Sequence, residues 1–346
     1  MTAEQKLKCV DICCGLNWGD EGKGKIVSQL CKDKFYDYVC RWNGGHNAGH
    51  TIYLNKKKYK THLIPSGIFF GVKSVIGPGC VLNIGLFLKE IEYMKNNGFD
   101  TDLIKISKNT HIITDKNIDD EINGINSLEY SHQGSTKTGV AMCYSDKYAR
   151  IGLRFKDVCD EFNLTSFIWD EKLYGNVLCE GAQGFWLDID MGNYPYVTSS
   201  NTLPYSSCSL GFPMKYIRKI YGATKIYDTR AGTDPEFPET LFDNKDLLIL
   251  GEIGEEYGTT TGRKRKVNYL NVDKLITAIN VSGTTDLIIS KVDILEKADI
   301  FKFIYNNKCT EFDNIIQMKT SLTNIIDKHT SLSTENIIYS SSAECI

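Results

Sequence analysis

Short apolar segments rich in β-branched residues alternate along this chain with segments of helical spacing, and this alternation restricts the fold more than any other feature. Buried strands are predicted at residues 7–14, 36–42, 73–77, 176–181, 223–229 and 286–295. Helices are predicted at residues 25–31, 83–98, 209–222 and 270–283. Such alternation is typical of an α/β fold, so we expect a central, largely parallel β-sheet flanked by helices.

A single domain, residues 1–346, is expected. No internal repeat, low-complexity tract or linker rich in proline and serine divides the sequence. The tail from about Phe301 onward contains strand segments and a helix, which we expect to cover one edge of the sheet.

Charge and cysteine content disfavour several classes of function. The formal net charge is −3, whereas a general nucleic-acid binder needs a basic surplus or a concentrated basic face. The 12 cysteines are scattered, and no two have the C-x-x-C spacing of zinc or redox sites. The sequence starts without a signal-peptide pattern, and no apolar run reaches the roughly 18 residues of a membrane span. We expect a cytoplasmic protein with no nucleic-acid or membrane partner.

The segment CCGLNWGDEGKGKIV, residues 13–27, has the design of a phosphate-binding turn. An apolar strand leads into glycines and lysines and then into a predicted helix, whose amino end favours an anion. It is not a Walker A motif, because the spacing differs and Ile26 follows the second lysine. Asp20 would repel a bare phosphate. Its carboxylate makes sense if it holds Mg²⁺, takes a proton from the substrate, or does both.

The segment RWNGGHNAGHT, residues 41–51, is a second glycine-rich loop after a predicted strand. His46 and His50 are four residues apart, as on a metal-binding helix, but the intervening glycines argue against a helix. A general acid or an oxyanion stabiliser is therefore favoured over a zinc ligand.

Two further motifs offer ligand-binding groups. GTTTGRKRK, residues 258–266, places Arg263 and Arg265 beside threonines, a set that suits a small dicarboxylate; the alternative is a solvated basic turn. SKVD, residues 290–293, resembles the guanine-reading element of GTP-binding proteins, because one carboxylate can accept hydrogen bonds from both N1–H and the exocyclic amine of guanine. As a four-residue match, SKVD is a weak signal.

Taken together and in order, six motifs resemble the adenylosuccinate synthetase family. They are WGDEGKGK, GGHNAGHT, HLIPSG, EGAQGFWLDID with YPYVTSSNT, TTGRKRK and SKVDIL. The resemblance runs from about Val10 to Leu295. It implies a P-loop-like GTP-binding architecture with appended elements, and a ligase that converts IMP, L-aspartate and GTP to adenylosuccinate, GDP and phosphate.

The resemblance also implies roles for individual residues. Asp20 would take the N1 proton of IMP and coordinate Mg²⁺, with the Gly45 carbonyl as a second metal ligand. The resulting oxyanion would attack the γ-phosphate of GTP, giving a 6-phosphoryl-IMP intermediate. His46 would act as the acid, and Lys23 would hold the phosphates.

Other positions correspond to substrate contacts of the family. The residues implied for IMP are Asn43, Thr136, Arg150, Gln183 and Thr198. Those implied for aspartate are Thr260, Thr261, Arg263 and Arg265. Those implied for GTP are Glu21, Gly22, Lys23, Gly24, Lys25, Gly49, His50, Thr51, Lys291, Asp293, Ser340 and Ser342. Arg150 matches an arginine that reaches the IMP of the partner subunit, which implies a homodimer.

Departures from the family pattern leave an alternative open. Residues 135–142 read STKTGVAM where the common pattern is TTGRGIGP, and the chain is several dozen residues shorter than most members. Short forms include a phage-type enzyme that acts on dGMP, in which the aspartate at the position of Asp20 is replaced by a small residue. Asp20 favours IMP, and Asp293 favours GTP over ATP. A switch GTPase would need a Walker A lysine followed by serine or threonine, and a non-catalytic relative would have lost Asp20 or His46.

Overall fold

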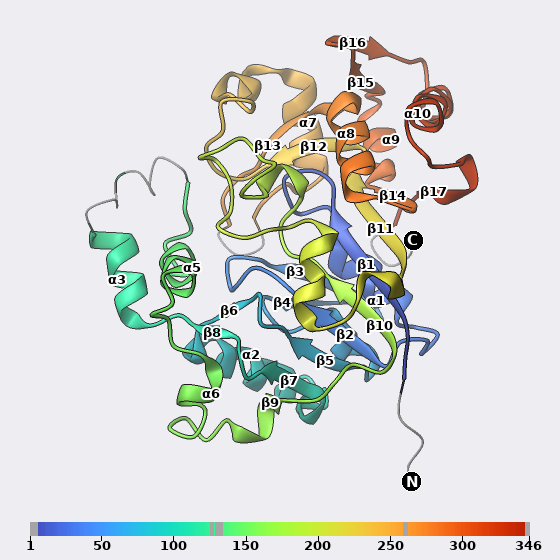
Figure 1. The fold of residues 1–346 in the computed structure, drawn as a ribbon. Coiled ribbons are helices and arrows are strands. Elements are labelled where there is room, and N and C mark those ends of the chain that lie inside the picture. The colour runs from blue at the N-terminus through green and yellow to red at the C-terminus, as the bar shows by residue number, and fades with distance from the viewer. Residues whose placement is uncertain (1–5, 125–127, 129–133, 259–261, 343–346) are drawn as a thin grey trace.

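A nine-stranded, wholly parallel sheet forms the centre of the part of the chain that the structure describes (Figure 1). The structure is a computed structural model, and it describes residues 6–124, 128, 134–258 and 262–342. The strand order in the sheet is β17-β14-β11-β1-β10-β2-β5-β7-β9. Their bounds are β1 (Leu7–Gly15), β2 (Tyr38–Arg41), β5 (Lys73–Ile76), β7 (Ile104–Ser107), β9 (Ile168–Trp169), β10 (Gly175–Glu180), β11 (Ile217–Lys225), β14 (Asp286–Ser290) and β17 (Ile337–Tyr339).

Smaller sheets and helices surround this sheet. Further strands are β3 (His50–Leu54), β4 (Lys57–Thr61), β6 (Val81–Leu82), β8 (His111–Ile112), β12 (Tyr227–Arg230), β13 (Lys266–Asn271), β15 (Lys302–Tyr305) and β16 (Lys308–Glu311). The α-helices are α1 (Lys23–Leu30), α2 (Ile84–Asn96), α3 (Asp115–Asn123), α5 (Val140–Ala149), α6 (Phe155–Val158), α7 (Lys245–Ile253), α8 (Val272–Ser282), α9 (Val292–Ala298) and α10 (Ile315–His329). Short 3₁₀ helices are η1 (Ser66–Phe70), η2 (Thr101–Leu103), η3 (Thr165–Phe167), η4 (Phe185–Leu187), η5 (Pro204–Leu210), η6 (Met214–Tyr216), η7 (Glu239–Asp243) and η8 (Thr334–Asn336).

The arrangement follows from the sequence pattern. From Val10 to Gly15, β1 is buried at every position, because β10 and β11 flank it and other layers cover both faces. The amino end of α2 is capped by Asn83, whose side chain accepts a hydrogen bond from the backbone N–H of Leu86. Figure 1 shows α7–α10 gathered at one end of the molecule and α2 and α6 at the other, with β1 between them. The predicted α/β class is thus confirmed.

Three predictions about elements were wrong. Residues 209–222 do not form one helix: Pro213 follows η5, and the chain enters β11, where Ile220 pairs with Ile12 of β1. The strand predicted at 223–229 breaks at Ile226, so that β12 joins a different, four-stranded sheet. The strand predicted at 286–295 ends at Ser290, and α9 follows it. The tail was expected to cover one edge of the sheet, and β17 is indeed an edge strand of the central sheet, paired with β14.

The parallel arrangement decides where a site can form. The strands β14, β11, β1, β10 and β2 are consecutive neighbours, so their carboxyl ends meet at one edge of the sheet. The loops that leave these ends contain the motifs singled out in the sequence. Ligands of open parallel sheets bind at this edge.

Candidate active site

The turn between β1 and α1, residues 16–22 (the β1–α1 loop), turns one carboxylate inward and leaves the next accessible. Gly19, Asp20 and Gly22 all have positive φ, at 88°, 62° and 87°. The carboxylate of Glu21 is buried and accepts hydrogen bonds from the backbone N–H groups of Asn17 at 3.2 Å and Gly19 at 2.8 Å. Glu21 therefore fixes the shape of the loop from within, whereas Asp20 keeps 29% of its side chain exposed.

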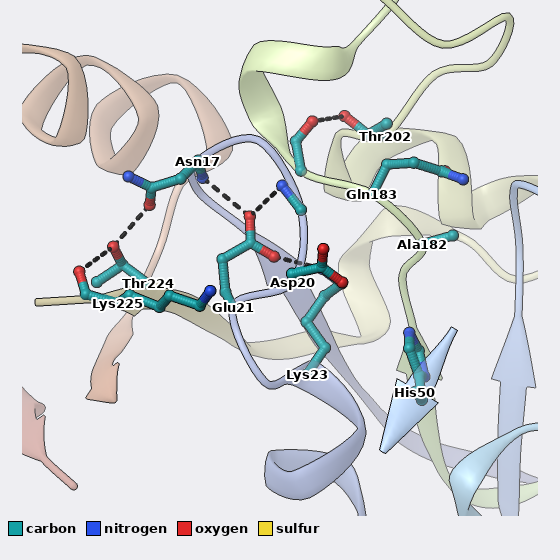
Figure 2. Close-up of polar contacts among 12 residues, drawn as sticks. Asn17, Asp20, Glu21, Lys23, His50, Ala182, Gln183, Thr202, Thr224 and Lys225 are labelled. Atoms are coloured by element: carbon teal, nitrogen blue, oxygen red, sulfur yellow. Dashed lines mark hydrogen bonds and ion pairs between the residues drawn. The ribbon is translucent and has the colours of Figure 1, made fainter. Parts of the chain in front are cut away.

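Further hydrogen bonds tie this loop to its neighbours (Figure 2). Asn17 Nδ2 donates to Asp228 at 2.5 Å, and Asn17 Oδ1 accepts from the hydroxyl of Thr224 at 2.6 Å. The hydroxyl of Ser290, at the end of β14, contacts the carbonyl oxygens of Glu21 at 3.1 Å and Thr224 at 3.0 Å. The loop is thereby held to the ends of both β11 and β14.

The two lysines in the first turn of α1 are largely buried. Lys23 Nζ pairs with Glu21 Oε2 at 2.5 Å, and Lys25 Nζ donates to the hydroxyl of Ser340 at 2.7 Å. A Cβ at Gly24 would lie 2.7 Å from Cβ of His50, so glycine lets the first turn of α1 approach that histidine. The first backbone N–H groups of a helix have no acceptor within the helix, so the amino end of α1 suits a phosphate.

The two histidines that follow β2, His46 in the loop and His50 at the start of β3, have different surroundings. His46 is buried, its Nδ1 accepts from the backbone N–H of Asn83 at 3.4 Å, and its Nε2 has no hydrogen-bond partner among the described residues. Burial, with His62 and Arg41 nearby, lowers the pKa of His46 to about 3. His50 instead pairs through Nδ1 with the buried carboxylate of Glu180.

Glu180 is fully enclosed and well supplied with donors. It also accepts from the backbone N–H of Ser66 at 2.7 Å and from its hydroxyl at 2.6 Å. Burial alone would raise the pKa of Glu180, but His50, Arg41 and Ser66 together lower it to about 2. Burial lowers the pKa of His50, and Glu180 opposes that effect. Glu180 is therefore an ionised acceptor for Nδ1–H of His50.

A series of ion pairs leads from Asp20 through Arg265 to the buried carboxylate of Glu256. Arg265 Nε lies 2.8 Å from Asp20 Oδ2, and Arg265 Nη1 lies 2.5 Å from the buried Glu256. Glu256 also accepts from Lys225 Nζ at 2.8 Å. Beyond Glu256, Lys291 Nζ donates to the Gly254 carbonyl at 2.8 Å. Cations and carboxylates therefore alternate along this side of the site.

These groups surround a cavity of about 530 Å³, which is the size expected for a small-molecule site. The predicted site residues that line it are Asp20, Glu21, Gly22, Lys23, Gly24, Lys25, Gly49, His50, Thr51, Thr136, Gln183, Thr198, Arg263, Arg265, Lys291, Asp293 and Ser342. The sequence motifs therefore converge on one cavity.

The described residues that were predicted for the site but do not line the cavity are Asn43, Gly45, His46, Arg150 and Ser340. Asn43 instead ties two loops together: its Oδ1 accepts from the backbone N–H of Ala182 at 3.0 Å. Arg150 is exposed at the carboxyl end of α5, with φ of 64°. Thr260 and Thr261 lie outside the described residues.

Sequence reasoning missed several cavity residues. Asn47 lines the cavity and accepts from Gln183 Nε2 at 3.3 Å. It stands inside the motif GGHNAGHT, so that motif could have indicated it. Lys225 and Arg230 also line the cavity. Lys225 ends the strand β11 and stands in no such motif, whereas Arg230 belongs to the segment TRAGTDPEFPE, residues 229–239, whose glycine and hydroxyl groups could have indicated it.

Comparison with known proteins identifies the family. The family model described as adenylosuccinate synthetase matches residues 12–174 and 163–332. This chain belongs to the adenylosuccinate synthetase family. The adenylosuccinate synthetase of Acetivibrio thermocellus is 37% identical over an alignment of 338 positions, which covers 82% of this chain and 78% of that protein. That of Streptococcus sanguinis is also 37% identical, over 86% of this chain and 79% of the relative. The family consists of ligases that form a C–N bond, and this chain is such a ligase.

Solved structures agree with the fold. The fully ligated adenylosuccinate synthetase from Plasmodium falciparum superimposes with a TM-score of 0.81 at 28% identity, over 97% of this chain and 98% of that one. The succinoaminodeoxyadenylate synthetase of cyanophage S-2L, bound to dGMP and dATP, gives a TM-score of 0.69 at 18% identity, over 93% of this chain and 100% of that one. The second match shows a shared fold and no more.

Within the described residues no helix is long and apolar enough to cross a membrane. Among the same residues no group of three or more histidine, cysteine, aspartate or glutamate side chains could hold a metal ion.

Proposed function

We propose that this protein catalyses the GTP-dependent ligation of IMP and L-aspartate to adenylosuccinate. The observation that carries the proposal is the position of Asp20. Its carboxylate lies in one cavity with the amino end of α1, the cation Arg265 and the segment SKVD. This reaction needs four parts: a base, a phosphate-binding turn, a carboxylate-binding group and a guanine-reading segment.

The reaction takes two steps in this proposal. Asp20 accepts the N1 proton of IMP, and the O6 oxyanion attacks the γ-phosphorus of GTP while the bond from that phosphorus to the β–γ bridging oxygen breaks. GDP leaves, and 6-phosphoryl-IMP remains. The neutral amine of aspartate then attacks C6, the C6–O bond breaks, and the proton lost by the amine leaves with the departing phosphate as HPO4²⁻. Positioning and charge neutralisation provide most of the catalysis in such phosphoryl transfers.

The geometry supports His50, in place of His46, as the histidine that acts on the transferring phosphoryl group. His50 lines the cavity, whereas His46 does not. Glu180 occupies Nδ1 of His50, which leaves Nε2 for a ligand. A phosphate beside Nε2 favours the protonated ring, because its negative charge stabilises the imidazolium that Glu180 already stabilises from the other side.

The charged groups at the loop fit Mg²⁺ as well. Mg²⁺ in nucleotide enzymes takes one or two carboxylate ligands and completes its shell with phosphate oxygens and water, and Asp20 is a partly exposed carboxylate in the cavity wall. The carbonyl of Gly49, in place of that of Gly45, is the better-placed second ligand, because Gly49 lines the cavity. When bound, Mg²⁺ supplies positive charge that offsets the charge of the phosphates.

The remaining substrate contacts are part of the same proposal. For IMP, Asn47 replaces Asn43, which is occupied between two loops, and joins Thr136, Gln183 and Thr198. Arg263 and Arg265, with Thr260 and Thr261, would bind aspartate. For GTP, Lys291 and Asp293 with Ser342 would contact the base, and Ser340 would support Lys25.

A homodimer and a cytoplasmic location complete the proposal. Arg150 is exposed and does not line its own cavity, and it would reach IMP in the partner subunit. Its neighbours Tyr148 and Ile151 leave 69% and 74% of their surfaces exposed, as expected for residues that a second copy covers. The eleven described cysteines are all free thiols, which fits a reducing compartment.

A single-turnover assay tests the function directly. Purified protein receives Mg²⁺, aspartate and GTP with either IMP or dGMP, and products are followed by mass. We expect adenylosuccinate from IMP. Product from dGMP alone would replace this proposal with the phage-type reaction, and product from neither would reject both.

The matched variants are Asp20→Asn and Asp33→Asn. Asparagine tolerates the positive φ of Asp20, so this change removes the base without straining the loop. We expect Asp20→Asn to slow product formation by about a thousandfold, within the range for general base catalysis. Asp33 is exposed beyond the end of α1, and its variant should match the parent protein.

A further inference from the structure

A buried carboxylate, that of Glu256, lies behind the cavity wall among basic side chains. Its side chain is 0% exposed. Oε2 accepts from Lys225 Nζ at 2.8 Å and from Arg265 Nη1 at 2.5 Å, and Oε1 accepts from the hydroxyl of Tyr227 at 2.7 Å. Lys291 Nζ lies 4.0 Å from Oε1. Burial alone would raise the pKa of Glu256, but these three cations lower it to about 2.

The three cations come from separate parts of the chain and all line the cavity. Lys225 ends β11, Arg265 precedes β13, and Lys291 caps the amino end of α9. One carboxylate cannot neutralise three positive charges. Among the described residues that line the whole cavity, eight are basic and five are acidic. Counting Glu256 as a sixth acid still leaves a positive surplus, which favours an anionic substrate.

Arg265 is held from two sides. Its Nη1 faces Glu256, and its Nε faces Asp20 at 2.8 Å. A substrate carboxylate can therefore replace Asp20 beside the guanidinium while Glu256 keeps the other edge in place. Without Glu256, Asp20 would be the one carboxylate partner left to Arg265 among the described residues, and the substrate would compete with it.

We infer that Glu256 is a positioning residue that fixes Arg265 and Lys225 for binding of the amino-acid dicarboxylate. This inference rests on the proposed function, because it assigns Arg265 to aspartate. It concerns affinity for aspartate, and a residue that merely maintained the fold would not affect one substrate selectively.

Steady-state kinetics of Glu256→Gln tests the inference. The KM for aspartate should rise at least about tenfold, since a buried charge loses its partner. The KM for IMP should change less than about twofold and kcat at saturating aspartate less than about threefold, as for an interaction used mainly in binding. Adenylosuccinate formation by the parent protein establishes the function first, so failure of the inference is distinguishable from failure of the function.

Matched variants separate charge from other effects. Tyr227→Phe removes a hydrogen bond from the same carboxylate but keeps its charge, and Glu252→Gln changes an exposed glutamate of α7. Both should keep the parent KM for aspartate within about twofold, since neither alters the buried charge balance.

Glu256→Asp keeps the buried charge and provides the test if the glutamine variant does not fold, which a melting curve decides. Its shorter side chain should raise the KM for aspartate about threefold while kcat is retained. An unchanged KM for aspartate in Glu256→Asp and in any folded Glu256→Gln would overturn the inference. A fall in kcat without a rise in that KM would overturn it too.

Discussion

The two loops that meet at the cavity both contain neutral hydrogen bonds, but they differ in the ion pairs of their acidic side chains. In the β1–α1 loop the acidic side chains are in ion pairs, Asp20 with Arg265 and Glu21 with Lys23. The loop between β2 and β3, residues 42–49 (the β2–β3 loop), is held by neutral hydrogen bonds such as that between Asn43 and Ala182. A charged substrate competes for ion-pair partners but leaves neutral hydrogen bonds in place. The first loop therefore holds the groups that react, and the second forms a fixed wall.

His50, directly after the β2–β3 loop, differs from that loop because it pairs with a carboxylate, that of Glu180.

The same substitution at His46 and at His50 tests whether only the charge-paired histidine takes part in the reaction, and it should give the largest effect. In His50→Asn the amide can still donate to Glu180 but Nε2 is gone, and we expect kcat to fall about 10²- to 10³-fold. In His46→Asn the side-chain oxygen can still accept from the Asn83 backbone, and kcat should fall less than about threefold.

Steady-state assays at saturating substrates, with melting curves for both variants, measure this difference. Equal losses of kcat in two folded variants would show that the histidines share the work. That result would contradict the assignment to His50.

Removing the internal ion pair of the β1–α1 loop should cost stability. Glu21→Gln leaves Lys23 buried without its carboxylate, and we expect the free energy of unfolding to fall by about 3 kcal/mol. Urea denaturation measures the change. Asp33→Asn, an exposed acid near the same helix, provides the control. A loss no larger than that of the control would mean that ion pairs do not order this loop.

Glu180→Gln tests whether the carboxylate behind His50 orients the ring. The imidazolium loses its counter-charge, so kcat should fall about tenfold while the KM values change little. The pH dependence of stability gives a second measurement. Because the pKa of Glu180 is lowered from 4.5 to about 2, its stabilising contribution is complete above pH 4.5 and is lost as the pH falls toward 2.

Urea titrations of the parent protein and of Glu180→Gln between pH 5 and pH 2 should therefore converge at the acidic end. Parallel curves would indicate that the carboxylate makes no pH-dependent contribution to folding.

The smallest expected effect lies in the β2–β3 loop. Asn43→Ala removes neutral hydrogen bonds and should lower the free energy of unfolding by about 1 kcal/mol. Its KM for IMP should stay within about twofold of the parent value, whereas Asn47→Ala should raise that KM about tenfold. A larger KM for IMP in Asn43→Ala than in Asn47→Ala would instead identify Asn43 as the IMP contact.

The sequence was sufficient for the parts of the fold and site that depend on local pattern. Buried strands such as residues 7–14 and the turn around Asp20 are visible in the order of apolar residues and glycines. The segment 209–222 was misread because its isoleucines fit helical spacing as well as strand pairing with β1.

What the sequence could not show is which loop residues face the cavity. His46 and His50 stand in the same motif, and Glu180, which distinguishes them, is 130 residues away from His50. Glu256 was missed because nothing in the sequence marks its pairing with Lys225 of β11, although its other partner Arg265 is only nine residues away.

The contact of Ser290 with the β1–α1 loop has a consequence for the size of the nucleotide. Ser290 ends β14 directly before Lys291 and Asp293, and its hydroxyl contacts the Glu21 carbonyl next to the phosphate-binding turn. This contact therefore fixes a distance within the site. It is the distance from the segment proposed to contact the base to the turn proposed to contact the phosphates. A nucleotide whose phosphate chain is one unit shorter, held by its base, would not reach as far along the turn. We therefore expect this fixed span to favour nucleotides of one length, in addition to any preference for the base.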